Sequence, residues 1–467
     1  MMNRSIAIAV AAMFLGGCAT FSQDGGFGAV QKVVKERTGQ EARWARSDDE
    51  ASAVRARTRE ILARPLSADA AVQLALLNNP GLQATYAELG IAEADLVQAG
   101  RGPNLRLHWL RTKVGNDVAK VEESFAFDLL GVLLMPLRQK MEARRFERVQ
   151  AEVTAEVIRI AMQTRKAWVQ AVSAAETERY MGQVKEAAEA GSELARRMAA
   201  VGNWPKLTQM REQVFYADAA AQLARARQTA QAERERLARL LGLWGGELAF
   251  RLPERLPDLP VAPREGEELE ARAMEQRLDV RAAKRETEWV AESLGLAKAT
   301  RFINALELGR ARTKEGHEPF AYGYVVGVEI PIFDWGGARV ARAEATYMQA
   351  AHRVAEVAIN ARSEVREAYG AYRGAFDLAR HYRDEVVPLR KRISEEMLLR
   401  YNGNLASVFE LLADSREQIG AVNAYLGALR EFWIADAELQ ASLSGRAGGS
   451  AAMGIEMPSP AAGGRGH

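Results

Sequence analysis

The feature that most restricts the fold of this chain is an internal duplication. Three landmarks each recur about 200 residues later, a period far longer than that of ordinary helical repeats. Residues 79–84 (NPGLQA) match 277–282 (RLDVRA), 135–137 (MPL) match 330–332 (IPI), and the Gly202-Asn203 pair matches Gly403-Asn404. The 467 residues are therefore predicted to form two copies of one structural unit.

Each copy is predicted to contain a helix, two strands, a very long helix, a short turn and a returning helix. In the first copy the initial helix must end at residues 100–103 (GRGP), because Gly and Pro do not continue it. A segment rich in Pro separates the copies and reads as an extended connection along the outside. We expect an N-terminal periplasmic segment at 18–65, a first repeat at 66–241, a linker at 242–265, a second repeat at 266–443 and a disordered tail at 444–467.

Apolar and polar residues alternate in the predicted strands, near 104–112, 124–129, 304–311 and 320–329. Such alternation is typical of transmembrane β-strands with one side toward lipid, and is equally consistent with a half-buried strand of a soluble sheet. Four strands cannot close a barrel, and an open sheet edge is not tolerated in hydrocarbon, so a membrane barrel would have to be shared between chains. The residues expected to face lipid are Leu105, Leu107, Trp109, Phe125, Phe127, Leu306, Leu308, Tyr322 and Tyr324.

The long helices form the second argument for an elongated protein. Residues 338–400 contain one proline, Pro388, and at ~1.5 Å per residue they would reach roughly 90 Å. Small and apolar residues recur with a period of 3.5 from Tyr347 to Ile393, which predicts coiled-coil packing. An ordinary two-stranded coiled coil would explain this period. The position of each long helix directly after a strand favours a barrel that continues into a helical tube.

The amino terminus reads as an export signal. Arg4 precedes a short apolar run, and residues 15–18 (LGGC) resemble the lipobox of bacterial lipoproteins. We therefore expect a signal peptide at 1–17 and lipidation of Cys18, which is the only cysteine. Ala19 stands where an inner-membrane retention signal would place Asp, so sorting to the outer membrane is implied.

Composition argues against several other classes of function. The 63 basic and 61 acidic residues balance, which argues against a nucleic-acid-binding protein. The five histidines show no metal-ligand spacing, and no nucleophile elbow or phosphate-binding loop is present. Met453 and Met457 have no Cys or His partners nearby. We expect no enzyme activity, no cofactor and no metal site.

Taken together, these motifs resemble those of the TolC-like outer-membrane factor family, lipoprotein type. The resemblance covers about residues 66–443 and rests on Asn79-Pro80, on the junction 329–337 (EIPIFDWGG), and on 400–403 (RYNG) running into 409–412 (FELL). It implies a mainly helical trimer in which four strands per chain build a twelve-stranded membrane barrel that continues into a periplasmic helical barrel. The sequence departs from the family at residues 128–136 (DLLGVLLMP), where the usual glycine-containing turn is replaced.

The resemblance also implies a function, that of a passive conduit without cofactor. The partners implied are two further copies of the chain, outer-membrane lipid, a periplasmic adaptor protein and an inner-membrane pump. The turns expected to meet the adaptor are Val201, Gly202 and Asn203 together with Asn402, Gly403 and Asn404. The glycines could instead be needed only for chain reversal.

An acidic aperture is expected at the second of these turns. Glu410 and Asp414 are four residues apart near a predicted helix start, so they share a face and would form an acidic ring in a trimer. Glu410 matches the family's aperture carboxylate, whereas Asp414 is offset by one position. Alternatively, both carboxylates only favour the helix dipole. Tyr401 either bonds across the closed tip or packs.

The main rival hypothesis is a non-channel helical periplasmic lipoprotein that acts as a scaffold or adaptor. It would explain the heptads but not the alternating strands at equivalent positions of both repeats. The cargo and the pump class are not predicted by the sequence.

Overall fold

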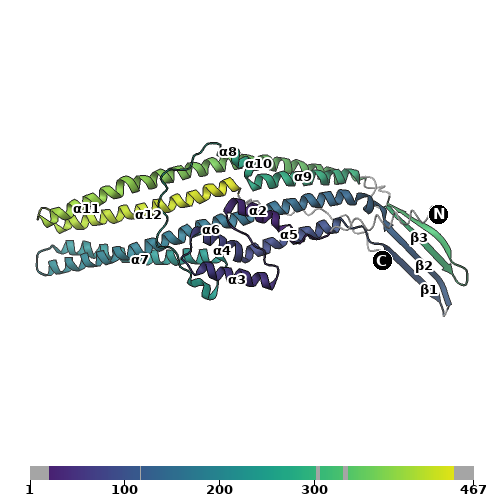
Figure 1. Cartoon of the computed structure of the whole chain (residues 1–467), viewed down its shortest axis with the longest axis horizontal. Helices are drawn as coiled ribbons and strands as arrows, with labels where there is room; N and C mark the ends of the chain where they lie inside the picture. The colour runs from purple at the N-terminus through teal and green to yellow at the C-terminus, as the bar shows by residue number, and fades with distance from the viewer. Residues whose placement is uncertain (1–19, 116, 301–305, 330–334, 446–467) are drawn as a thin grey trace.

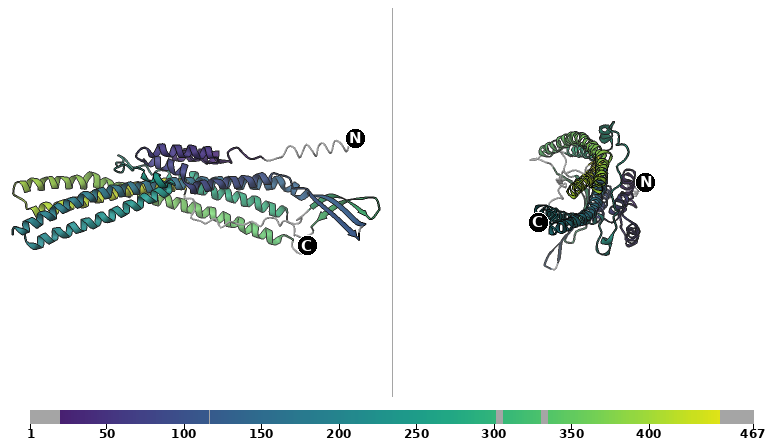
Figure 2. Two further views of the ribbon diagram at one scale, coloured as in Figure 1. Left: turned by 90° about the horizontal axis from the view of Figure 1, so that it is seen from below. Right: turned by 90° about the vertical axis from the view of Figure 1, so that its left-hand side faces the viewer.

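The computed structural model describes residues 20–115, 117–300, 306–329 and 335–445 as an elongated molecule. A four-stranded sheet lies at one end and two helical hairpins lie at the other (Figure 1). The first helices of the chain pack to one side of the long helices near the middle (Figure 2). The main hydrophobic core lies in this middle region, where Leu76, Tyr86, Val172 and Phe432 are among the fully buried side chains.

The first half of the chain has the expected order of elements. Two of the first three helices have serine N-caps, with Ser47 and Ser67 accepting hydrogen bonds from the amides of Glu50 and Ala70. The elements are α2 (Phe27–Thr38), α3 (Asp48–Leu62), α4 (Ala68–Asn78), α5 (Pro80–Ala99), β1 (Arg106–Val114), β2 (Asp117–Asp128), α6 (Leu129–Ala200) and α7 (Lys206–Leu241). The 72 residues of α6 correspond to a helix of roughly 108 Å.

The second half repeats this order. The connection contains the 3₁₀ helix η1 (Gly245–Ala249) and packs through Phe250, Leu256 and Leu259. The elements that follow are α8 (Leu269–Gln276), α9 (Leu278–Ala299), β3 (Leu306–Glu315), β4 (Ala321–Val328), α10 (Gly337–His381), η2 (Tyr382–Val386), α11 (Val387–Asn402) and α12 (Val408–Ser444). A π-helical turn, η2, lies directly before Pro388, which has no N–H and displaces the carbonyl one turn back.

The strands form one antiparallel sheet in the order β1-β2-β3-β4. The central pair joins the repeats, because β2 lies beside β3, with Phe127 opposite Leu308. Among the described strands, the outer edges of β1 and β4 have no strand partner.

The residues that begin α5 and α9 make equivalent hydrogen bonds in the two repeats. Asn79 is the N-cap of α5, and its amide donates to the carbonyl of Leu240 near the end of α7, at 2.8 Å. Arg277 is the N-cap of α9, and its guanidinium donates to the carbonyl of Ser442 near the end of α12, at 3.0 Å. Each repeat therefore ties its first helix to its returning helix through one polar side chain.

The first junction between strand and helix differs from the second. Asp128 caps α6 by accepting a hydrogen bond from the amide of Gly131 at 2.8 Å, so the helix begins at Leu129 and Pro136 lies inside it. The second junction falls partly outside the described residues, and α10 begins at Gly337.

Candidate functional site

The sheet has one apolar and one small or polar face. Directly opposite residues of antiparallel strands share a face, and the register places Leu107 opposite Phe125, and Phe127 opposite Leu308. All nine residues predicted to face lipid alternate onto this one face. Seven of them are exposed in the single chain, namely Leu105, Leu107, Trp109, Phe125, Leu308, Tyr322 and Tyr324; Phe127 and Leu306 are partly exposed.

The opposite face carries small and charged side chains. Ala126 lies opposite Arg106 on one side and Gly309 on the other, and Gly309 is packed so closely that a Cβ would lie 2.2 Å from the carbonyl oxygen of Phe125. Over these small residues the guanidinium of Arg106 on β1 reaches Glu307 on β3. This face therefore combines small side chains with an ion pair that spans β1 and β3.

The helical hairpins end in two short turns at the far end of the molecule. In the turn between α6 and α7, Gly202 has a φ of 75°, a left-handed conformation that favours glycine. In the turn between α11 and α12 the left-handed residue is Asn404, with a φ of 57°, whereas Gly403 has a φ of −82°. The backbone of the first turn therefore favours glycine, whereas in the second turn an asparagine takes the left-handed conformation.

Both turns are open to solvent. Val201 is 69% exposed, and Asn203, Asn402, Gly403 and Asn404 are also exposed. Tyr401, at the end of α11, is only partly exposed. The residues predicted to contact an adaptor therefore form the accessible end of the helical region.

An aromatic contact joins the two turns. Trp204 follows the first turn and is 8% exposed, and its ring centroid lies 4.4 Å from that of Phe409 in the first turn of α12. The sequence interpretation did not include Trp204. A tryptophan directly before Pro205 in an otherwise polar turn was the available signal.

Glu410 takes part in a capping box at the start of α12. Its carboxylate accepts hydrogen bonds from the Ser407 amide at 2.7 Å and from the Ser407 hydroxyl at 3.0 Å, while its own amide donates to Ser407 Oγ. The Ser407 amide holds the pKa of Glu410 below its ordinary value. Glu410 is exposed, so its charge is available to solvent at the tip.

Asp414 lies one turn further along α12 in a different environment. It is 8% exposed and accepts a hydrogen bond from the hydroxyl of Ser394 on α11 at 2.5 Å. The same hydroxyl lies 3.3 Å from the side-chain oxygen of Gln418. Within one chain the Asp414 carboxylate therefore links α11 to α12, whereas Glu410 is directed to solvent.

An ion pair between a buried glutamate and a partly exposed arginine joins the two hairpins below the tip. Glu212 on α7 is 5% exposed and accepts from the guanidinium of Arg416 on α12 at 2.5 Å. The Arg416 guanidinium carbon also lies 4.5 Å from the ring centroid of Phe215. No local sequence pattern predicts this pair, because its members are about 200 residues apart and belong to different repeats.

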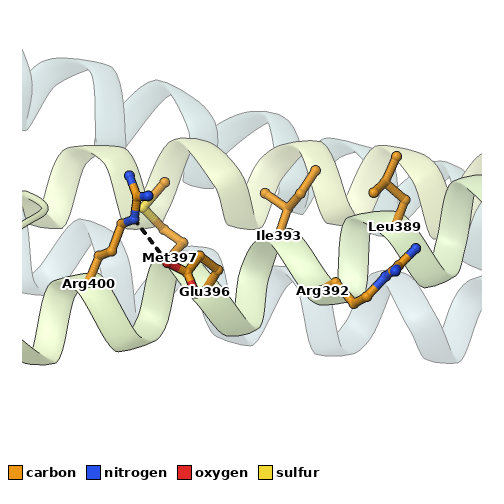
Figure 3. Close-up of a pocket in the computed structure, with 6 residues that line it drawn as sticks. All are labelled: Leu389, Arg392, Ile393, Glu396, Met397 and Arg400. Carbon is orange, nitrogen blue, oxygen red and sulfur yellow. Dashed lines mark hydrogen bonds and ion pairs between the residues drawn. The ribbon is translucent and has the colours of Figure 1, made fainter.

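A shallow groove of about 350 Å³ lies along one side of α11. Leu389 and Ile393 point to the same side of the helix in Figure 3, and Arg400 forms an ion pair with Glu396. Leu389 is 52% exposed, so this apolar surface is uncovered in a single chain.

Several predicted features lie outside the described residues. These are Cys18 with the signal peptide, residues 330–334 of the second junction, and nearly all of the C-terminal tail.

None of the helices in the described part of the chain combines the length and the apolar character needed to cross a bilayer. The described residues also contain no group of three or more acidic or histidine side chains placed to hold a metal ion.

Comparison with known proteins identifies the fold. No protein-family model and no curated protein sequence matches the chain. Among solved structures, the outer-membrane channel OprN superposes with a TM-score of 0.68 at 19% identity, over 83% of this chain and 92% of that one. The outer membrane protein VceC of Vibrio cholerae has a TM-score of 0.67 at 17% identity, over 84% and 97%. The outer membrane channel MtrE of Neisseria gonorrhoeae, in its open state, has a TM-score of 0.67 at 17% identity, over 80% and 88%. The chain has the TolC-like fold of these channels.

Proposed function

We propose that the chain is the outer-membrane channel subunit of a tripartite efflux or export system, a passive conduit from the periplasm to the outside. The observation that carries the proposal is the four-stranded sheet, with one exposed apolar face and two edges without partners, at the end of long helical hairpins. An open edge is not tolerated in hydrocarbon, because its N–H and C=O groups would lack hydrogen-bond partners. Strands from further copies of the chain satisfy β1 and β4.

We propose that three copies of the chain assemble into one channel. Four strands from each of three chains make twelve, within the range of bacterial barrels. The helices also carry uncovered apolar surface that suits contacts between copies. On α7 the exposed side chains Leu207, Met210 and Val214 follow a helical spacing, and on α11 the groove at Leu389 and Ile393 is uncovered.

The remaining parts of the proposal rest on the sequence of the amino terminus and on the exposure of the two tip turns. Cys18 anchors the mature chain in the outer membrane, and the exposed turns at Val201–Asn203 and Asn402–Asn404 meet a periplasmic adaptor that leads to an inner-membrane pump. The fold shared with outer-membrane channels supports placing the sheet in the outer membrane.

We further propose that Glu410 lines an acidic aperture at the tip. Its exposed carboxylate, repeated three times, favours cations. Asp414 would join such a ring only by leaving Ser394, so its contribution requires a rearrangement of α11 against α12. Tyr401, at the end of α11, lies close enough in sequence to the turn to take part in closing the tip.

The first test is the mass of the membrane-extracted protein, measured by size exclusion with light scattering. We expect extraction to require detergent and the particle to be a trimer that conducts ions in a planar bilayer. A monomer, or a protein released by salt alone, would contradict the channel and favour the helical lipoprotein scaffold.

A further inference from the structure

The apolar face of the sheet changes in character along the strands. Next to the helices it is apolar, and toward the hairpin turns it becomes basic. The register gives four successive rows across this face, counted from the helices. The first row is Phe127, Leu308 and Val326, and the second is Leu107, Phe125, Arg310 and Tyr324. The third row is Trp109, Glu123, Arg312 and Tyr322, and the fourth, nearest the turns, is Arg111, Val121 and Lys314. Figure 1 shows the hairpins projecting beyond the helices. Arg111, Arg312 and Lys314 lie in the rows nearest the hairpin turns, whereas Arg310 lies in the second row from the helices.

The charges on this face do not balance. Its basic side chains are Arg111, Arg310, Arg312 and Lys314, named here the basic border, and in these rows they face the single carboxylate of Glu123. The Nε of Arg312 donates a hydrogen bond to Glu123 Oε2 at 2.6 Å. Among the described residues neither Arg111 nor Arg310 has a carboxylate partner.

The opposite face has no such excess. On that face the basic residues Arg106, His108 and Lys120 lie among the acidic residues Glu122, Glu307 and Glu315. Arg106 forms an ion pair with Glu307, and Lys120 forms one with Glu122. The basic excess is therefore a property of the apolar face and not of the hairpins as a whole.

Aromatic rings accompany the basic border. Trp109 and Tyr322, in the same row, are 59% and 70% exposed. The guanidinium carbon of Arg312 lies 4.9 Å from the ring centroid of Phe320, and Lys314 Nζ lies 5.9 Å from it, so both cations are held near the hairpin end. Aromatic rings and long basic side chains together are typical of the boundary between hydrocarbon and headgroups, where the cation reaches out of the apolar layer.

We propose that the basic border binds anionic lipid headgroups of the leaflet that the hairpin turns reach. Guanidinium groups bind phosphate oxygens through two parallel hydrogen bonds, and within the described part of the chain no carboxylate pairs with Arg111 or Arg310. The inference rests on the proposed membrane insertion of the strands and adds a lipid preference to it.

The test uses Trp109 as a local reporter, because it lies on the same face as the basic border. The full chain is reconstituted in phosphatidylcholine vesicles that contain brominated phosphatidylglycerol or brominated phosphatidylcholine at the same low mole fraction. The signal of Trp109 is isolated by subtracting that of the Trp109→Phe variant. We expect brominated phosphatidylglycerol to quench Trp109 about two- to five-fold more than brominated phosphatidylcholine does, and this preference to fall at high salt.

The variant Arg111→Gln/Arg310→Gln removes two cations without breaking an ion pair and is expected to abolish the preference. The matched control Arg211→Gln/Arg225→Gln removes two exposed cations from α7, far from the sheet, and is expected to retain it. Equal quenching by the two lipids in the unmodified chain would overturn the lipid preference and leave the channel intact. An absence of quenching by either lipid would overturn membrane insertion itself.

Discussion

The indole of Trp204 lies against the ring of Phe409, with centroids 4.4 Å apart, and this contact joins the turn between α6 and α7 to the first turn of α12. It is the aromatic link between the two repeats at the tip of the described helices. This contact therefore connects the two turns that are proposed to meet an adaptor.

Removal of this link is expected to loosen the tip. Trp204→Ala truncates a nearly buried ring and should cost about 3 kcal/mol of local stability, or roughly a hundred-fold in the opening equilibrium. Hydrogen exchange should show faster amides at the start of α12 in this variant, although α12 itself is unchanged. Val201→Ala, at an exposed position of the same turn, is the control and should leave exchange unaltered. Protection that persists in Trp204→Ala would show that the contact does not couple the turns.

The capping role and the charge of Glu410 can be separated by two substitutions. Glu410→Gln keeps an acceptor for the Ser407 amide, since Gln also completes a capping box, but it removes the charge. Ser407→Ala keeps the charge and should cost about 1 kcal/mol through loss of the cap. If Glu410 lines an aperture, cation preference in single-channel recordings should fall in Glu410→Gln and persist in Ser407→Ala. Equal preference in both variants and the unmodified chain would remove Glu410 from the aperture.

The two tip turns should respond differently to alanine. Gly202→Ala places a Cβ in the left-handed region and should destabilise the first turn by about 1 kcal/mol. Gly403→Ala should leave stability unchanged or raise it slightly, because φ is −82° and the nearest atom to a new Cβ, the Leu399 carbonyl oxygen, lies at 3.5 Å. Thermal unfolding of both variants would measure the difference. A larger loss in Gly403→Ala than in Gly202→Ala would contradict the turn geometry.

The sequence predicted the order of elements and the faces of the strands because both depend on periodicity. Alternation in the strands needs only the period of two, and the register then places Leu107 opposite Phe125 and Phe127 opposite Leu308, on one face. The equivalence of Asn79 and Arg277 was also visible, although the residue types differ, because each begins the first helix of its repeat.

The details of the tip could not be predicted in this way. A spacing of four places Glu410 and Asp414 on similar sides of a helix, but it does not reveal that α11 covers one of them and supplies Ser394. The ion pair of Glu212 and Arg416 depends on how two hairpins from different repeats pack, a long-range contact that no local pattern encodes.

Arg277 is expected to be one of the most sensitive positions in the second repeat. It is 1% exposed and binds Asp279 at 2.6 Å and Glu364 at 2.8 Å, besides the Ser442 carbonyl. Arg277→Met would leave two carboxylates without their shared partner and should cost about 3 kcal/mol. Arg281→Met changes an exposed arginine on the same helix and is the control. Thermal unfolding that is equally affected in both variants would show that the network contributes little.

Asp436 should give the chain a stability that declines as pH rises. The carboxylate is 5% exposed, and burial raises its pKa above the ordinary value of 3.8 despite Arg264 at 3.2 Å. The folded state therefore holds the proton of the Asp436 carboxyl more tightly than the unfolded state does. Its contribution to the free energy of unfolding is present below pH 3.8 and is lost as pH rises through the raised pKa.

Asp436→Asn removes this titration while its side-chain oxygen can still accept from Gln440. The unfolding temperature of the variant, compared with that of the unmodified chain, should rise progressively as the pH increases above 3.8, because only the unmodified chain must ionise a buried carboxyl. Asp377→Asn, which removes an exposed carboxylate on α10, is the matched control and should show no such trend. A difference between Asp436→Asn and the unmodified chain that does not change with pH would mean that Arg264 fully offsets the burial.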